Sequence, residues 1–280
     1  MNRRKFIGNS IIGTVGAGFL GGIYAWQVEP FWLEFVEREM PVKNLPPGLE
    51  GKTLMQISDM HVGNRFNYQY IIDSLKKAKI FKPDIVMYTG DYTTYEGNEQ
   101  FEQLDEVLNH TIKGKMGTIG ILGNHDYGHN WSENHVAHRI TRQLEGAGIE
   151  VLRNQKTNIE GLDFLGFDDY WGLNFNPAEV MKEYNPSTPT IALCHNPDVC
   201  DLDIWNNFKG WILSGHTHGG QLKPPFLTPP MLPVTNKRYT CGAFDLNDGR
   251  NLYINRALGH LIQVRLNVRP EITVFRLERV

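Results

Sequence analysis

Five short apolar runs, each followed directly by polar residues, are the main pattern in the sequence. The runs occupy residues 53–57, 85–89, 118–122, 190–194 and 211–214. They show little alternation between apolar and polar positions, as is typical of strands that are covered on both faces. Apolar residues at helical spacing predict helices at residues 70–78 and 101–112, and a third around Val136, Ile140 and Leu144, with Ser132 as its N-cap.

Further strands are predicted outside these runs. Residues 33–42 mix apolar and charged positions and contain Pro41, which favours an edge strand. Strands are also expected at residues 150–152, 162–167, 239–244, 251–255, 261–266 and 272–277. Asn247, Asp248 and Gly249 have the sequence of a hairpin turn. Strands alternate with helices first and follow one another later, which indicates an α/β fold whose last strands build a second sheet.

Side chains that commonly bind metals follow each of the five runs. They are Asp59 and His61, Asp91, Asn124 with His125 and Asp126, His195, and His216 with His218. Because open α/β proteins place their sites where successive strands end, we expect these side chains to converge. In extended backbone two residues that are one apart point to the same side, so the pair His216 and His218 is expected to face one site. One such pair is a weak signal, whereas five clusters in order are a strong one.

Composition excludes some classes of protein. The formal net charge of −3 offers no basic surface, and no nucleic-acid partner is expected. Three cysteines in 280 residues are too few for a disulfide framework. Cys194, Cys200 and Cys241 are therefore expected to be small buried residues, with one disulfide as the alternative. A chain of this length can bury a full-sized core, and we assign residues 30–280 to one catalytic domain.

Residues 1–29 have the composition of an export signal or a membrane anchor. Arg3 and Arg4 precede residues 6–26, which carry no charge. Paired arginines in this position indicate a twin-arginine signal, and thus the twin-arginine export machinery as a partner. The glycines favour a signal, whereas the absence of an Ala-x-Ala cleavage site and the presence of Trp26 favour retention at a membrane surface. We expect the protein at the outer face of the membrane or elsewhere in the cell envelope.

The ordered motifs resemble those of the calcineurin-like metallophosphoesterases. That family carries Asp-x-His, Gly-Asp, Gly-Asn-His-(Asp/Glu), a lone His and Gly-His-x-His, and all five occur here in this order between residues 53 and 221. The Gly-Gly-Gln after the last motif, the paired arginines and the tail at residues 269–273 look most like bacterial YaeI-like and YkuE-like phosphodiesterases. The resemblance implies a four-layer αββα sandwich, in which two facing mixed sheets carry helices on their outer sides.

The resemblance also implies a site for two divalent metal ions. One ion would be held by Asp59, His61, Asp91 and His218, and the other by Asp91, Asn124, His195 and His216. Ligands without thiolate favour manganese, iron or zinc. Such a pair would supply hydroxide at neutral pH for attack on phosphorus. His125 would protonate the leaving group or stabilise the transition state, and Asp126 would orient His125.

The implied activity is hydrolysis of a phosphodiester or a pyrophosphate. UDP-2,3-diacylglucosamine is one candidate substrate, which would place the enzyme in lipid A biosynthesis. An exported enzyme would be on the opposite side of the membrane from that cytoplasmic step, so another envelope phosphodiester is a nearly equal candidate. The alternative is a non-catalytic metal-binding scaffold, although scaffolds usually lose ligands that are all present here. The proline-rich loop at residues 222–234, with Phe226 and Met231, is either packed at the core edge or a contact surface for acyl chains.

Overall fold

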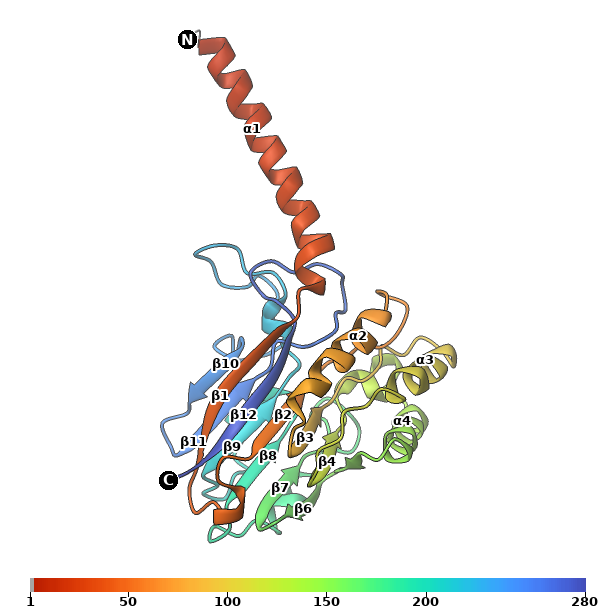
Figure 1. Cartoon of the computed structure of the whole chain (residues 1–280), viewed down its shortest axis with the longest axis vertical. Coiled ribbons are helices and arrows are strands. Elements are labelled where there is room, and N and C mark those ends of the chain that lie inside the picture. Colours follow the sequence, from red (N-terminus) through yellow and green to blue (C-terminus); the bar gives the residue numbers. More distant parts are fainter. Residues whose placement is uncertain (1–2) are drawn as a thin grey trace.

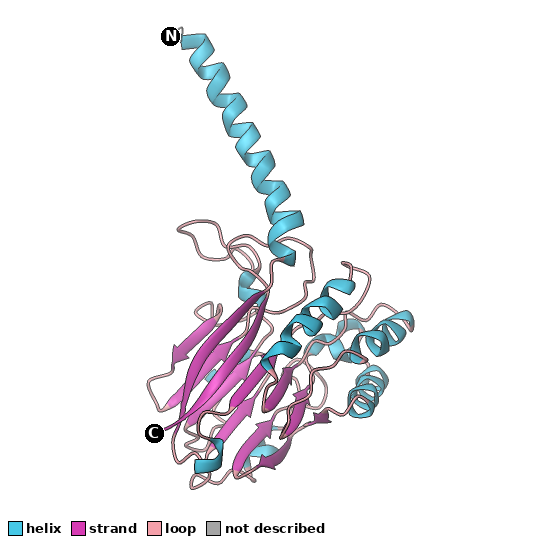
Figure 2. Ribbon diagram, viewed as in Figure 1, coloured by secondary structure: helices cyan, strands magenta, loops and turns pink. Residues whose placement is uncertain are grey.

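Two mixed six-stranded sheets pack face to face in the computed structural model, which describes residues 3–280 (Figures 1 and 2). The strand order is β1-β12-β2-β3-β4-β5 in the first sheet and β10-β11-β9-β8-β7-β6 in the second. Apolar side chains from the inner faces of both sheets, among them Leu54, Phe164 and Phe275, form one buried cluster between them. The predicted α/β sandwich is confirmed.

The strands and helices have the following bounds. The first sheet contains β1 (Glu34–Val42), β2 (Thr53–Ile57), β3 (Ile85–Thr89), β4 (Gly117–Ile121), β5 (Glu150–Val151) and β12 (Glu271–Arg279). The second contains β6 (Gln155–Ile159), β7 (Leu162–Gly166), β8 (Thr190–Leu193), β9 (Gly210–Ser214), β10 (Gly242–Asp245) and β11 (Arg250–Ile254). The helices are α1 (Arg3–Ile23), α2 (Gln69–Ala78), α3 (Glu99–Leu108), α4 (Asn134–Gly146) and α5 (Pro177–Met181).

Helices cover the outer faces of the two sheets. Ile72 of α2, Leu104 of α3 and Ile140 of α4 share a buried cluster with Val86 of β3. On the other side of the molecule, Val180 of α5 packs against the second sheet. Because both faces of each central strand are covered, the strands are mainly apolar, which explains the lack of alternation in the sequence.

The central strands end at the same end of the molecule as the base of α1. Strands β2, β3 and β4 are parallel, and β12 runs antiparallel to β2. The chain ends just after β12, at the end of the sheets remote from α1 (Figure 1). The carboxyl ends of β2, β3 and β4 therefore point towards the end from which α1 emerges.

Some local predictions were wrong or incomplete. Residues 261–266, predicted as a strand, form an irregular loop in which Leu266 makes one isolated bridge with Leu222. Ser132 does not cap α4, because its hydroxyl donates to the carbonyl of His129 and the helix begins at Asn134. Strand β6 and helix α5 were not predicted.

The N-terminal helix projects from the domain, and the chain then returns to it (Figure 1). Val15 and Phe19 are exposed on α1, whereas Glu29 is buried and accepts a hydrogen bond of 2.6 Å from the backbone N–H of Val268. None of the helices within the described range combines the length and the hydropathy needed to cross a lipid bilayer. Met1 and Asn2, the start of the predicted signal, lie outside the described residues. The signal itself and the domain boundary at residue 30 stay predictions.

Candidate metal centre

The seven predicted ligands come from five strand ends, and contacts across both sheets bring them together. Asp59 and His61 follow β2, and Asp91 follows β3. From the second sheet, the backbone N–H of His216 after β9 donates to Asp59 Oδ1 at 3.0 Å. The Nε2 atom of His195, which follows β8, lies 3.1 Å from Asp91 Oδ2. The two sheets therefore meet at one polar cluster, as expected from strands ending at a common edge.

The backbone has a positive φ at five of the seven predicted ligands, and the expectation of extended backbone at the paired ligands is wrong. The φ angle is +53° at Asp59, +47° at His61 and +53° at Asp91, and it is +69° at His216 and +51° at His218. Non-glycine residues adopt this region infrequently, and such strain concentrates at functional sites. Side chains that are one residue apart therefore converge because the chain turns sharply after each strand.

Glycine is required beside Asp91. Gly90 has a φ of +90°, and a Cβ atom there would lie 2.6 Å from the backbone nitrogen of Gly123 and 2.9 Å from Nδ1 of His195. A Cβ on Gly123 would in turn collide with the carboxylate of Asp91. The glycines of the second and third motifs thus let two loops approach closely enough to share one site.

One group of ligands gathers around Asp59. The Nε2 atoms of His61 and His218 lie 2.9 Å apart, and Asp59 Oδ1 is 3.3 Å from Nε2 of His218 and 3.9 Å from Nε2 of His61. All three side chains are buried. Two imidazole nitrogens and a carboxylate oxygen facing one another at these distances form a donor set that fits a metal ion.

A second group gathers around Asp91. Its members Asp91, His195 and His216 offer ligand atoms that lie within 4.8 Å of one another. Asn124, at the end of β4, is buried, and neither atom of its amide group has a hydrogen-bond partner in the described structure. Asp91 Oδ2 also lies 3.5 Å from Nε2 of His61. The carboxylate of Asp91 is thus between the two groups, and its Oδ2 faces both.

Hydrogen bonds orient three of the imidazoles. His195 Nδ1 donates to the carbonyl of Thr89 at 2.8 Å, which leaves Nε2 facing Asp91. His216 Nε2 donates to the carbonyl of Pro233 at 2.8 Å, which leaves Nδ1 free. His61 Nδ1 shares a hydrogen bond of 3.0 Å with the hydroxyl of Thr94. Partners of this kind set the tautomer and orientation of metal-binding histidines, and neither Thr94 nor Pro233 carries a sequence signal for that role.

The buried carboxylates and imidazoles of the cluster shift one another's pKa values. Burial alone would raise the pKa of Asp59, but His195 and His218 outweigh it and lower that pKa to about 2. Burial and His195 lower the pKa of His216 to about 3, and burial holds the pKa of His61 well below its usual value. The carboxylates raise the pKa of His195 well above its usual value in spite of burial. The Asp59 carboxylate is therefore ionised and the rings of His61 and His216 are neutral, as metal binding requires, whereas His195 would have to release a proton when a metal ion binds.

Comparison with known proteins identifies the family. The family model described as Calcineurin-like phosphoesterase matches residues 52–220, more than half of the chain. The chain belongs to the calcineurin-like phosphoesterase family. The resemblance predicted from the five motifs is confirmed.

Relatives extend over almost the whole of this phosphoesterase. The Escherichia coli protein named Phosphodiesterase YaeI is 29% identical over 99% of both chains. The uncharacterized metallophosphoesterase YkuE of Bacillus subtilis is 30% identical over 99% of this chain and 98% of its own. LpxG of Chlamydia muridarum, named as a UDP-2,3-diacylglucosamine pyrophosphatase, is 25% identical over 97% of this chain and 98% of its own.

His125 and Asp126 of the phosphoesterase occupy different environments. The His125 ring lies 5.0 Å from that of His61, and its backbone N–H donates to Asp91 Oδ1 at 2.9 Å. The Asp126 carboxylate instead accepts hydrogen bonds from the backbone N–H groups of Tyr92 at 2.8 Å and Gly123 at 2.9 Å. These contacts differ from the predicted orientation of His125 by Asp126. Asp126 joins the loop that carries Asp91 to the loop that carries Asn124.

Two tryptophans flank the site of the phosphoesterase. Trp171 stacks on Trp131 with ring centroids 4.8 Å apart, and its ring meets that of His216 edge to face at 4.5 Å. Asp169 holds this arrangement, because its carboxylate accepts the backbone N–H of Trp171 at 2.9 Å. The neighbouring Asp168 pairs with Arg153 at 2.9 Å. The carboxylates of Asp168 and Asp169 thus stabilise the loop that carries Trp171. Trp171 was not predicted from the sequence as a residue of the site.

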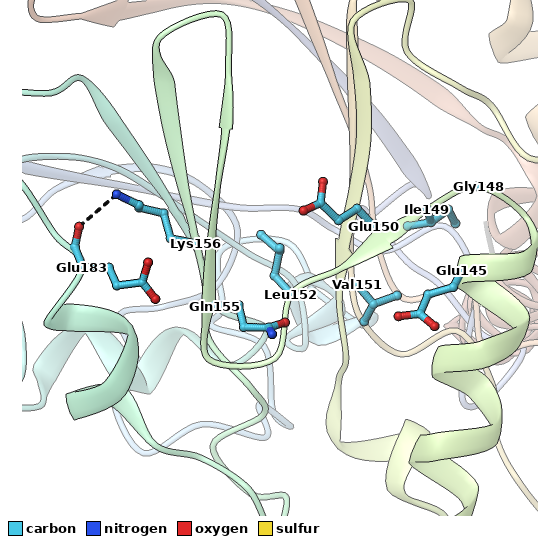
Figure 3. A pocket seen from close by; sticks show the side chains of 9 residues that line it. All are labelled: Glu145, Gly148, Ile149, Glu150, Val151, Leu152, Gln155, Lys156 and Glu183. Atoms are coloured by element: carbon cyan, nitrogen blue, oxygen red, sulfur yellow. Dashed lines mark hydrogen bonds between the residues drawn. The ribbon is translucent and has the colours of Figure 1, made fainter.

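One cavity of the phosphoesterase lies away from this centre. Its volume is about 560 Å³. Figure 3 shows the side chains that line it, which include Glu145, Glu150 and Glu183. Lys156, which also lines the cavity, donates to the carbonyl of Glu183 at 3.3 Å. No predicted ligand is among its described lining residues.

Proposed function

We propose that the chain is a two-metal phosphoester hydrolase that cleaves phosphodiesters or pyrophosphates at the cell envelope. The observation that carries this proposal is the position of Asp91, whose Oδ2 lies 3.5 Å from His61 Nε2 and 3.1 Å from His195 Nε2. A carboxylate between two sets of imidazoles can serve two ions at once. The names of two relatives, a phosphodiesterase and a pyrophosphatase, support the same reaction class.

The ligand assignment follows from the two groups. Asp59, His61, Asp91 and His218 would hold one ion, and Asp91, Asn124, His195 and His216 would hold the other. Imidazole, carboxylate and amide donors without thiolate favour manganese, iron or zinc. When bound, two such ions neutralise charge on the phosphate oxygens and make water acidic enough to supply hydroxide near neutral pH.

His125 would act on the leaving oxygen. Burial lowers the pKa of His125, so the imidazole is neutral at neutral pH before substrate binds. An anionic phosphate beside it would favour the protonated form, because the negative charge stabilises imidazolium. The ring could then donate its proton to the departing oxygen as the bond from phosphorus breaks, a step typically worth about 100- to 10,000-fold in rate.

The proposed location rests on the N-terminal residues. Arg3 and Arg4 precede a long uncharged segment, and α1 projects away from the domain with exposed apolar side chains. Replacing both arginines with lysine should leave the protein in the cytoplasm if the twin-arginine machinery exports it. Export of the double variant at the wild-type level would reject this part of the proposal.

The function can be tested with purified protein and three substrates. In Mn²⁺ the chain should hydrolyse bis(4-nitrophenyl) phosphate and a UDP-lipid pyrophosphate faster than the monoester 4-nitrophenyl phosphate. Asp91→Asn should abolish turnover of all three, because it removes a ligand from both ions. Turnover that survives chelation and this substitution would refute the metal-dependent mechanism.

A further inference from the structure

An apolar cavity of about 550 Å³ opens directly beside the metal centre. His216 and His218 form part of its wall, so the cavity and the metal centre share two side chains. The remaining lining is mainly apolar and includes Leu222, Met231, Leu232, Leu261, Ile262 and Val264. A mostly apolar lining with few polar groups, at this volume, is typical of a small-molecule site.

Two loops build this cavity, and hydrogen bonds hold them together. The side-chain amide of Gln221 donates to the carbonyls of Ile262 at 2.8 Å and Val264 at 3.0 Å. Backbone hydrogen bonds of 2.9 Å join Leu266 to Gln221 and to Lys223. Because these bonds fix the spacing between the loops, the cavity exists before any ligand enters.

The cavity offers little to a charged ligand. Among the described residues that line it, Lys237 alone carries a fixed charge. Its Nζ donates to the carbonyl of Leu232 at 2.8 Å and also to that of Val234. Gln221 uses its amide N–H groups to join the loops. An apolar chain fits here, whereas a buried ionic group would lack a partner and be disfavoured.

One of the two loops that build the cavity is hydrogen-bonded to the segment that follows α1. Arg265 donates its backbone N–H to the carbonyl of Ala25 at 2.8 Å, and the Gln263 side chain donates to that of Trp26 at 3.1 Å. Figure 1 shows the loops at residues 222–234 and 256–268 beside the base of this helix. Met231 is 60% exposed, so the core-edge interpretation of its loop is wrong for this side chain.

We propose that this cavity binds the alkyl chain of the substrate, which makes the preferred substrate a phosphodiester or pyrophosphate of a lipid. The inference rests on the proposed hydrolase function. A phosphate at the metal centre would be next to the rings of His216 and His218, and an alkyl chain attached to it could enter the cavity beyond them. Exposed apolar residues at the cavity rim and on α1 favour a lipid surface as the source of that substrate.

A chain-length series tests this inference on the full-length protein. The substrates are 4-nitrophenyl alkyl phosphates from methyl to dodecyl, each below its critical micelle concentration, in Mn²⁺. We expect kcat/KM to rise about fourfold for each methylene group until the cavity is filled. The double variant Met231→Ser, Ile262→Ser should reduce the dodecyl-to-methyl ratio of kcat/KM by roughly tenfold or more. The matched control Ile80→Ser, Leu173→Ser changes two exposed apolar residues outside the lining and should keep that ratio.

Binding without turnover separates this inference from the proposed function. Calorimetry with dodecylphosphonate and methylphosphonate, on metal-free full-length protein, should show tighter binding of the dodecyl compound. The double variant Met231→Ser, Ile262→Ser, called the rim variant here, should lose this preference, and the control variant should keep it. The inference would be overturned if kcat/KM did not change with chain length, or if the rim and control variants had the same preference for dodecylphosphonate. Self-association of the protein that the rim variant abolishes would also overturn it. Failure to hydrolyse any diester or pyrophosphate would refute the proposed function, while the binding comparison would still decide the role of the cavity.

Discussion

The Nε2 atoms of His61 and His218 lie 2.9 Å apart, although 157 residues separate them in the chain. One histidine follows the first sheet and the other follows the second. Asp59, whose Oδ1 is 3.3 Å from His218 Nε2, completes a buried group of three donors. Metal affinity should therefore depend on the hydrogen bonds that orient each ring, because a small rotation of a ring would separate the donor atoms.

Thr94 orients the His61 ring, so changing Thr94 tests whether such a hydrogen bond affects metal affinity. Its hydroxyl shares a 3.0 Å hydrogen bond with His61 Nδ1. Thr94→Val should reduce metal affinity about 10- to 100-fold while preserving the fold. Thr93→Val is a matched control, because the neighbouring Thr93 hydroxyl is buried without a hydrogen-bond partner in the described structure. Competition with a fluorescent chelator would measure both affinities, and equal affinities would show that Thr94 has no such role.

The effect of His125→Ala should depend on the leaving group if His125 donates a proton to it. Removing a proton donor should slow cleavage of an alkyl leaving group by about 100- to 10,000-fold. Cleavage of a 4-nitrophenyl group should slow much less, because that group leaves as a stable anion. His135→Ala changes an exposed histidine on α4 and should affect neither rate. Equal losses on both leaving groups would contradict proton donation, and steady-state kinetics with metal analysis of each variant measures the effect.

Asp169 should make stability depend on pH in an unusual direction. Burial raises its pKa from 3.8 to about 7. The folded chain therefore binds a proton that the unfolded chain releases, so this group contributes stability that is lost as pH rises from about 4 to about 7. The contribution is on the order of 4 kcal/mol across that interval. In urea unfolding of metal-free protein, Asp169→Asn should reduce the loss of unfolding free energy between about pH 4 and pH 7. The same pH dependence in the wild type and the variant would contradict the assignment.

Glu29 should stabilise the domain from outside the predicted boundary at residue 30. Its carboxylate accepts the backbone N–H of Val268, in the loop that carries the buried Arg265. Glu29→Ala would leave a buried N–H unpaired and should lower the free energy of unfolding by about 1–3 kcal/mol. Glu102→Ala, which alters an exposed residue of α3, is the control. A change no larger than that of the control would show that residues near Glu29 do not belong to the folded domain.

The positions of the strands and their polar ends could be predicted because the central strands are buried on both faces. Such strands have uninterrupted apolar sequences, and the residues after them must lie at a sheet edge. The left-handed backbone at Asp59 and His216 could not be predicted, because aspartate and histidine also occur in extended segments. Strand β6 was missed because its sequence, Gln-Lys-Thr-Asn-Ile, is largely polar.

The loop at residues 261–266 shows why an apolar pattern misled. Its apolar residues Leu261, Ile262 and Val264 line a cavity, and they make no strand. Arg265 within the loop is fully buried, and its guanidinium donates to the carbonyls of Gly259 at 2.8 Å and Arg256 at 2.9 Å. Such a satisfied buried charge depends on the folded loop around it and leaves no periodic signal in the sequence.

In the proposed site Asp91 serves two metal ions at once. Anomalous diffraction from crystals of the Mn²⁺-loaded chain tests it most directly. We predict two anomalous peaks, one beside Asp59, His61 and His218 and one beside Asn124, His195 and His216, with Asp91 in contact with both. A single peak, or two peaks with Asp91 in contact with one or neither, would contradict the account.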